Sequence, residues 1–276
     1  MPPFHAHPSV AALLGVPVAV YVRAVRAHAA ATGERLGRRR AALFALGVAT
    51  LAVGASWPIH DLAERALFSV HMVQHMLFTL VAPPLLLAGT PPWMLRRILA
   101  PRPLWLAWGF ATRPVVATVA YNGLLLFTHW PTVVEASVRS EPLHLGVHVA
   151  LFTSALAMWW PVMSPLPELP SLPPPGQMVY LFLQSLAPTI PASFLTFGRE
   201  PLYPVYATFP RVWGMDALTD QTIAGLTMKL VGGLILWAVI TAVFFRWFRE
   251  EEREEGWDAL RWRNVEREIQ RRVARR

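Results

Sequence analysis

The chain has 276 residues, of which 54% are hydrophobic and only 15% are charged, against about 25% charged residues in a typical soluble domain. Its net charge of +8 is the difference between 25 basic and 17 acidic residues. Of the basic residues 24 are arginines, and the one lysine lies inside an apolar run. This composition excludes a disordered chain, a coiled coil and an ordinary nucleic-acid-binding protein, and it indicates a polytopic membrane protein. Since there is no cysteine, disulfides, thiolate catalysis and iron–sulfur clusters are excluded. Any metal must be held by His, Met, carboxylate or backbone oxygen.

Seven apolar runs are each long enough to cross a bilayer core, which takes about 20 helical residues. We therefore predict an all-α integral membrane protein, a bundle of seven transmembrane helices. Pro83-Pro84 should kink or unwind the last turn of the third span, and Pro188 and Pro191 should bend the sixth. The seven runs are Val10–Val25, Ala41–Trp57, Leu67–Ala88, Val115–Trp130, Leu143–Met163, Met178–Phe197 and Thr222–Trp247.

The arginines are unevenly distributed between the connections. Segments 23–40, 96–113 and 246–276 hold 20 of the 24 arginines, and cytoplasmic connections carry the excess of basic residues. We therefore predict a cytoplasmic C-terminus and an N-terminus outside. Connection 163–177 falls on the cytoplasmic side although it has no basic residue.

Two parts follow from this topology, a transmembrane domain over residues 1–248 and a charged cytoplasmic tail helix over residues 249–276. The tail begins with acidic residues and ends with basic ones, which suits the helix dipole. Its narrow apolar stripe is typical of a solvated or membrane-surface helix, and docking to a partner is the alternative. The stripe consists of Trp262, Val265, Ile269 and Val273.

Eight of the nine histidines fall at or just below the extracytoplasmic surface in this topology. Two pairs, on the third and fifth spans, are spaced i, i+4, which places both rings of a pair on one helix face. Two imidazoles so placed can share a metal ion or line one pocket. The predicted metal ligands are His71, His75, His144, His148, His60, His129, Met72 and Met76, with His5 and His7 as mobile outer ligands.

A set of His and Met ligands without Cys suits copper. The alternative for each pair is a structural one, in which the imidazoles bond carbonyls of neighbouring helices. Asp220, Gln221, Asp61 and Lys229 are candidates to orient the ligands. Lys229 is costly in the bilayer unless it is paired, so we expect it to pair with Asp220 or with a group of the sixth span, or to extend outward.

Several segments resemble one family, the multi-span CtaG-type cytochrome c oxidase assembly factors. The most specific is HMVQHMLFTLVAPPLLLAGTP (71–91); supporting segments are His7-Pro8, WPIHDLAERALFSVHMVQHM (57–76), THWP (128–131) and DQTIAGLTMKLVGGL (220–234). The resemblance covers the chain to about residue 248. It implies a multi-pass protein of the bacterial cell membrane that matures a haem–copper oxidase at its copper centre, with an oxidase subunit as partner besides membrane lipid.

We rank the functions accordingly. An assembly factor that handles copper without catalytic turnover comes first. A membrane haem protein or a His-ligated metal oxidoreductase comes second, although no histidine lies at the depth that a second haem would need. A copper transporter comes third, because transporters place polar groups near the midplane at broken helices, and only a few residues here meet that description.

Overall fold

The computed structural model describes residues 8–273, which form helices and connections and contain no strand. The all-α prediction is confirmed. His5 and His7 lie outside the described residues, and so do 274–276 at the end of the predicted tail. The helices are α1 Pro8–Thr32, α2 Arg38–Ala55, α3 Ile59–Arg65, α4 Phe68–Met76, η1 Leu77–Val81 (a π turn), α5 Ala82–Gly89, α6 Pro92–Ile98, α7 Arg102–Ala111, α8 Pro114–Thr128, α9 Pro131–Arg139, α10 Glu141–Met163, α11 Pro174–Leu186, α12 Thr189–Phe197, α13 Pro204–Ala207, α14 Ala217–Leu226, η2 Thr227–Val231 (a second π turn) and α15 Gly232–Val273.

Five helical segments of the described chain are long and apolar enough to cross a membrane, which makes this a membrane protein. Two further pairs meet the same test together but are bent, α2 with α3 by 43° and α7 with α8 by 79°. The number of candidate spans is therefore five to seven, and the predicted count of seven is its upper limit. The five segments are Ala12–Thr32, Phe68–Gly89, Glu141–Met163, Pro174–Phe197 and Ala217–Arg253.

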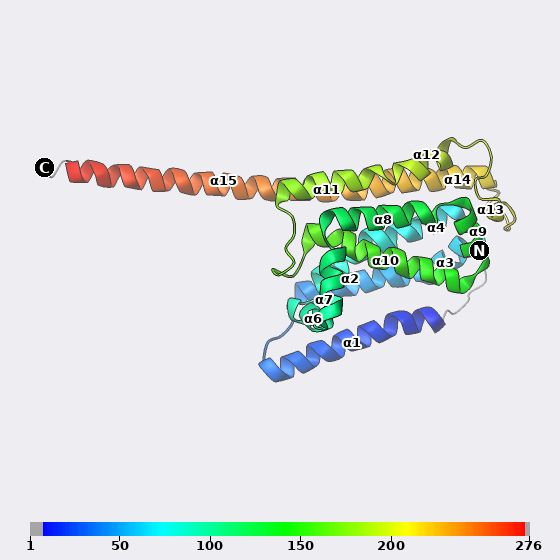
Figure 1. Cartoon of the computed structure of the whole chain (residues 1–276), viewed down its shortest axis with the longest axis horizontal. Coiled ribbons are helices and arrows are strands. Elements are labelled where there is room, and N and C mark those ends of the chain that lie inside the picture. Colours follow the sequence, from blue (N-terminus) through cyan, green and yellow to red (C-terminus); the bar gives the residue numbers. More distant parts are fainter. Residues whose placement is uncertain (1–7, 274–276) are drawn as a thin grey trace.

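The bundle has two distinct ends (Figure 1). One end, the tail end, holds α6, α7, the connections around residues 33–37 and 164–173, and the projecting half of α15. The other, the histidine end, holds α3, α9 and α13. The three arginine-rich segments thus share the tail end, as the topology requires. Which end faces the cytoplasm stays a prediction.

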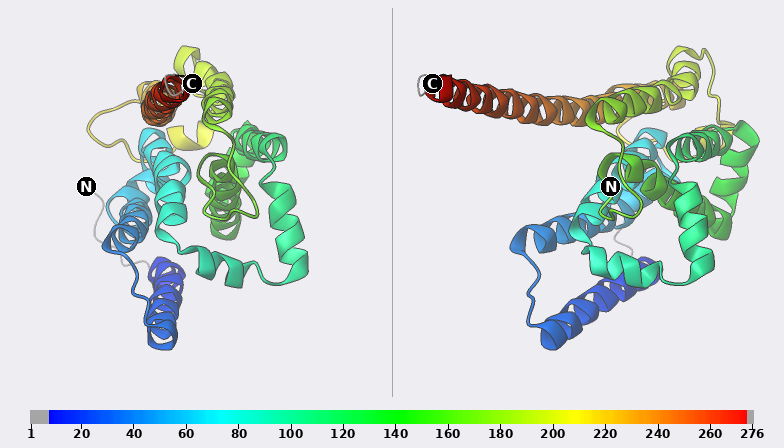
Figure 2. Two further views of the ribbon diagram at one scale, coloured as in Figure 1. Left: turned by 90° about the vertical axis from the view of Figure 1, so that its left-hand side faces the viewer. Right: turned by 60° about the vertical axis from the view of Figure 1, so that its left-hand side comes forward.

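The predicted tail is not a separate helix. α15 runs without a break from Gly232 to Val273 and projects far beyond the bundle (Figures 1 and 2). The last span and the charged tail therefore form one rod. Trp262 on this rod is exposed, as expected for a residue beyond the packed bundle.

The third span is distorted before its prolines rather than at its last turn. Pro83 has no N–H for the carbonyl of Thr79, four residues earlier. The chain inserts π turn η1 at this point, and the indole Nε1 of Trp159 donates to the Thr79 carbonyl at 2.9 Å. α5 then continues regularly to Gly89. The predicted unwinding after Pro83-Pro84 is therefore wrong, because a side chain of α10 satisfies the freed carbonyl.

The sixth and seventh predicted spans are irregular as well. α11 ends at Leu186 and α12 begins at Thr189, so the regular helix is interrupted beside Pro188. The predicted bend of this span stays a prediction. The seventh contains π turn η2 between α14 and α15. π turns are uncommon and often occur at functional sites. Here they fall in two neighbouring helices, since α14 packs on α4.

Close helix packing depends on glycine where α2 meets α5. A Cβ on Gly89 would collide with the backbone of Phe44, and one on Gly47 would lie 2.7 Å from Cγ of Leu86. α1 lies at the edge of the bundle (Figure 2) and is joined to it by the Tyr21 hydroxyl, which donates to the Gly89 carbonyl at 3.0 Å. These contacts hold α2 and α5 together. α2 leads into α3, and α5 follows α4 and η1, so the packing also helps to place α3 and α4.

Candidate metal centre

Five histidines line one cavity near the histidine end, with a volume of about 20 Å³. The five rings come from three helices that are distant in the sequence. α4 contributes one pair, α10 contributes the other, and the fifth ring follows the end of α8. The two i, i+4 pairs predicted from the sequence therefore face each other. The five are His71, His75, His129, His144 and His148.

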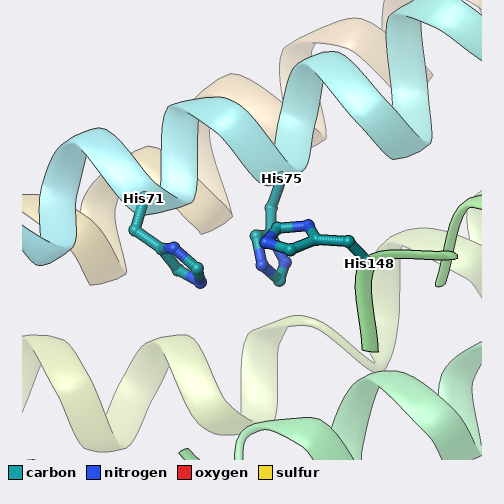
Figure 3. Close-up of side chains that lie close together, drawn as sticks. All are labelled: His71, His75 and His148. Atoms are coloured by element: carbon teal, nitrogen blue, oxygen red, sulfur yellow. The ribbon is translucent and has the colours of Figure 1, made fainter. Parts of the chain in front are cut away.

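Three of these rings are placed so that they could hold one metal ion. His71, His75 and His148 each offer a nitrogen, and these atoms all lie within 4.8 Å of one another. Figure 3 shows the rings of α4 and α10 directed into the space between the two helices. The ring centroids are 4.4 Å apart for His71 and His75, and 5.0 Å for His75 and His148. Small side-chain movements suffice to bring such nitrogens to a common ion, whose bonds to imidazole are about 2.0–2.1 Å long.

Unsatisfied nitrogens give an independent reason to expect a ligand. Nδ1 of His71, Nε2 of His75 and Nε2 of His129 are buried and have no hydrogen-bond partner in the described part of the chain. Leaving one such atom unpaired costs about 1–3 kcal/mol, and all three border the same cavity. A metal ion would satisfy them, because neutral imidazole binds metals through either nitrogen. The donor set therefore fits a metal.

The carboxylate of Glu64 lies beside the histidine cluster, next to His144 and His60. Oε1 of Glu64 on α3 lies 3.2 Å from Nε2 of His144 and 3.3 Å from Nε2 of His60. Nε2 of His144 is also 2.8 Å from Nε2 of His148. Glu64 thereby connects the cavity to α3. Sequence reasoning did not single out Glu64 among the carboxylates at this end of the chain's helices, although its i, i+4 spacing from His60 was a usable signal.

Two predicted ligands lie outside the cavity. His60 is linked to it through Glu64, and its Nδ1 lies 3.3 Å from the amide nitrogen of Gln74. Met76 lines a second cavity deeper in the bundle, whereas Met72 is fully buried against the histidines. The structure therefore brings together six of the eight predicted ligands. Met76 is separated because it lies one helical turn further from the histidine end than Met72.

Asp220 and Gln221 act on the scaffold rather than on the imidazoles. The buried carboxylate of Asp220 accepts from the backbone N–H groups of Phe68 (2.7 Å) and Ser69 (3.0 Å) and from the Ser69 hydroxyl (2.5 Å). It thus caps the N-terminus of α4, where a negative charge is favourable. Oε1 of Gln221 accepts from the N–H of Leu202 at 2.5 Å. Asp220 therefore fixes the start of the helix that carries two of the histidines.

Asp61 and Lys229, the other two residues expected to orient ligands, do not line the histidine cavity. Asp61 is buried in α3, one turn before Glu64, and does not line the cavity. Lys229 donates to the Thr189 hydroxyl at 3.1 Å and lies in the second cavity. Its predicted pairing with Asp220 is therefore wrong, because that carboxylate caps α4. A contact with the sixth span, the alternative prediction, is what the structure contains.

Two tyrosines from the connection around α13 close the site. The Tyr203 hydroxyl donates to the His129 carbonyl at 2.7 Å, and Tyr206 lines the cavity. Burial raises the pKa of both phenols above the usual value, and the carboxylate of Asp220 raises that of Tyr206 further. Both therefore stay neutral near pH 7. They shield the cavity without adding charge to it.

A comparison with known protein families identifies the family of this chain. The model of the cytochrome c oxidase caa3 assembly factors matches residues 19–250. The chain belongs to this family. The match includes all five cavity histidines and Glu64, but neither His5 nor His7 nor the end of α15. The resemblance inferred from residues 71–91 is thereby confirmed for most of the chain.

Two relatives of this chain add little about function. Uncharacterized protein Mb0105 of Mycobacterium bovis and uncharacterized protein MT0111 of Mycobacterium tuberculosis are each 24% identical to it over 215 residues. The match covers 68% of this chain but 31% of each relative, so the chain spans about a third of their length. No solved structure matches.

Proposed function

We propose that this protein matures a haem–copper oxidase by binding copper in the histidine cavity and passing it to an oxidase subunit. Family membership supports the oxidase as the target. The observation that carries the copper site is the group of three imidazoles within 4.8 Å, two of which have a buried, unpaired nitrogen. The role is delivery without catalytic turnover, with His71, His75 and His148 as ligands and His144, His129 and Met72 beside them.

The donor set favours copper among the metals. Imidazole suits copper, zinc, iron and nickel, and a thioether shifts the preference toward Cu(I). Met72 supplies a thioether at the wall of the cavity. The ligand set has no thiolate because the chain has no cysteine. Binding through neutral imidazoles and a thioether suits a carrier that must release its ion again.

The size of the cavity favours an ion over a haem. About 20 Å³ is room for about one water molecule, whereas a porphyrin needs a slot between its axial ligands. The ring centroids of His71 and His148 lie 5.6 Å apart, and Phe68 and Tyr206 line the same cavity. A single metal ion fits the site without rearrangement of the helices.

Metal analysis of the purified protein tests this function. The full chain in detergent is incubated with Cu(I) under reducing conditions, desalted, and analysed for copper and for visible absorption. We expect about one copper per chain, because the three imidazoles complete one site, and no Soret band. A Soret band, or copper retention equal to that of a His71→Ala/His75→Ala variant, would overturn the copper site.

The proposed delivery also requires the histidine end to face away from the cytoplasm. A reporter fused after Arg276 should read cytoplasmic, and one inserted in segment 132–141 should read extracytoplasmic, because the arginines concentrate at the tail end. The opposite result would place the cavity on the cytoplasmic side. It would then favour a His-ligated metal oxidoreductase over a delivery factor.

A further inference from the structure

The lysine of the seventh predicted span is unusual in its depth and in the direction that it faces. Lys229 lies in π turn η2, 12 residues after α14 begins at Ala217, which places it about 18 Å along the helix. The next charged residue toward the tail is Arg246. Lys229 is exposed on the surface of the bundle. An ammonium in this position faces lipid, where an isolated charge is unfavourable.

This ammonium is only partly satisfied within the chain. It donates to the Thr189 hydroxyl on α12 at 3.1 Å, which is a neutral partner. Between residues 8 and 253 it forms no ion pair with a described carboxylate. Asp220, the acidic residue of the same helix, is already bonded to the start of α4. Among these described residues, the positive charge therefore has no counter-charge.

A recess surrounds this charge. It lies between α11 and α12 on one side and η2 and α15 on the other, helices that run side by side in Figure 1. Small or hydroxyl side chains form its rim, and a Cβ placed on Gly233 would meet nothing within 4 Å. Small residues let a second transmembrane helix approach closely. The rim, meaning the lining residues that are at least partly exposed, consists of Ser185, Pro188, Thr189, Lys229 and Gly233.

We propose that this lysine recess docks a transmembrane helix of another protein that carries an Asp or Glu at the same depth. Each of these charges is costly alone in hydrocarbon, and pairing removes both costs. A lipid headgroup is a poorer partner, because Thr189 lies eight residues before the end of α12 at Phe197, or about 12 Å below it. The inference goes beyond metal binding and does not depend on it.

Two designed peptides test the charge requirement. Each is a labelled transmembrane helix of Leu and Ala, one with a central Glu and the other with a central Gln. Binding to the labelled full-length protein is measured by energy transfer in phosphatidylcholine vesicles. We expect the Glu peptide to bind about 10-fold more tightly than the Gln peptide, since a desolvated ion pair is stronger than a neutral hydrogen bond.

Variants assign that preference to the recess. Lys229→Met should bind both peptides equally, and Val119→Met, on the exposed face of α8, should keep the wild-type preference. Equal binding of the two peptides to wild-type protein, or an unchanged preference in Lys229→Met, would overturn the proposal. So would loss of the preference when about 20% phosphatidylglycerol is added, because the charge would then be a lipid site. Copper retention serves as a separate readout and should not change in Lys229→Met.

Discussion

The two cavities of this protein have the same size and opposite chemistry. Each has a volume of about 20 Å³, and the same helical segment, α4 with η1, borders both. The histidine cavity collects five imidazoles and Met72, whereas the lysine recess has three methionines and an ammonium. A cation entering the second would meet a positive charge. The comparison teaches that the groups lining a space, rather than its size, decide which cavity is suited to a metal.

The largest effect should come from removing the α4 imidazoles. His71→Ala/His75→Ala should lose most copper binding and oxidase maturation, because even the loss of a group that only orients a ligand typically costs 10- to 100-fold in affinity. Copper content and oxidase activity are measured in cells at matched protein level. His28→Ala is the control, since that ring stacks on Trp93 rather than on the cluster.

A purely structural role of the two rings makes a different prediction. Hydrogen bonds between membrane helices average about 0.6 kcal/mol, so removing them would weaken packing only slightly. Copper content and maturation would then stay near wild-type in the double variant. That result at normal protein level would refute the histidine site and leave the two cavities without a functional difference.

A smaller effect is expected when the carboxylate beside the cluster is neutralised. Glu64→Gln keeps an oxygen near His60 and His144 but removes the negative charge that stabilises a positively charged site. We expect copper affinity to fall about 10-fold, measured by competition with a Cu(I) chelator. Glu135→Gln is the matched control, because Glu135 pairs with Arg139 within α9 and does not line the cavity. Equal affinities of the two variants would show that Glu64 has no part in the site.

The cap of α4 should affect stability as well as binding. Asp220→Asn weakens three hydrogen bonds to a charged acceptor, each worth about 1.5–3 kcal/mol, so the thermal unfolding midpoint in detergent should fall. Asp216→Asn is the control, because the exposed Asp216 caps α14 rather than α4 and Asn caps a helix about as well as Asp. If both variants melt together, Asp220 is not the anchor of α4.

Sequence periodicity predicted the helices that carry the site better than it predicted the contacts between those helices. The i, i+4 spacing placed each histidine pair on one face, and the apolar runs placed the helices. The hydrogen bond that satisfies the Thr79 carbonyl in π turn η1 could not be predicted, because its donor, Trp159, lies on a helix 80 residues away. Glu64 was not singled out for a similar reason, since its contact with His144 joins two distant helices. Contacts between distant helices carry no local pattern.

The smallest effect should distinguish the two methionines of α4, which share a helix and a spacing but line different cavities. Exchanging Met for Leu conserves volume and costs less than about 1.5 kcal/mol in a core, so both variants should fold. Met72→Leu removes a thioether from the histidine cavity, and Cu(I) affinity should fall a few-fold, to about one third, because imidazoles still supply most of the binding. Met76→Leu changes only the lysine recess and should retain wild-type affinity. Both are titrated against the same Cu(I) chelator, with thermal midpoints recorded to show that packing is intact. A larger loss in Met76→Leu than in Met72→Leu would mean that the ion sits deeper than the imidazoles, and it would reverse the assignment of the two cavities.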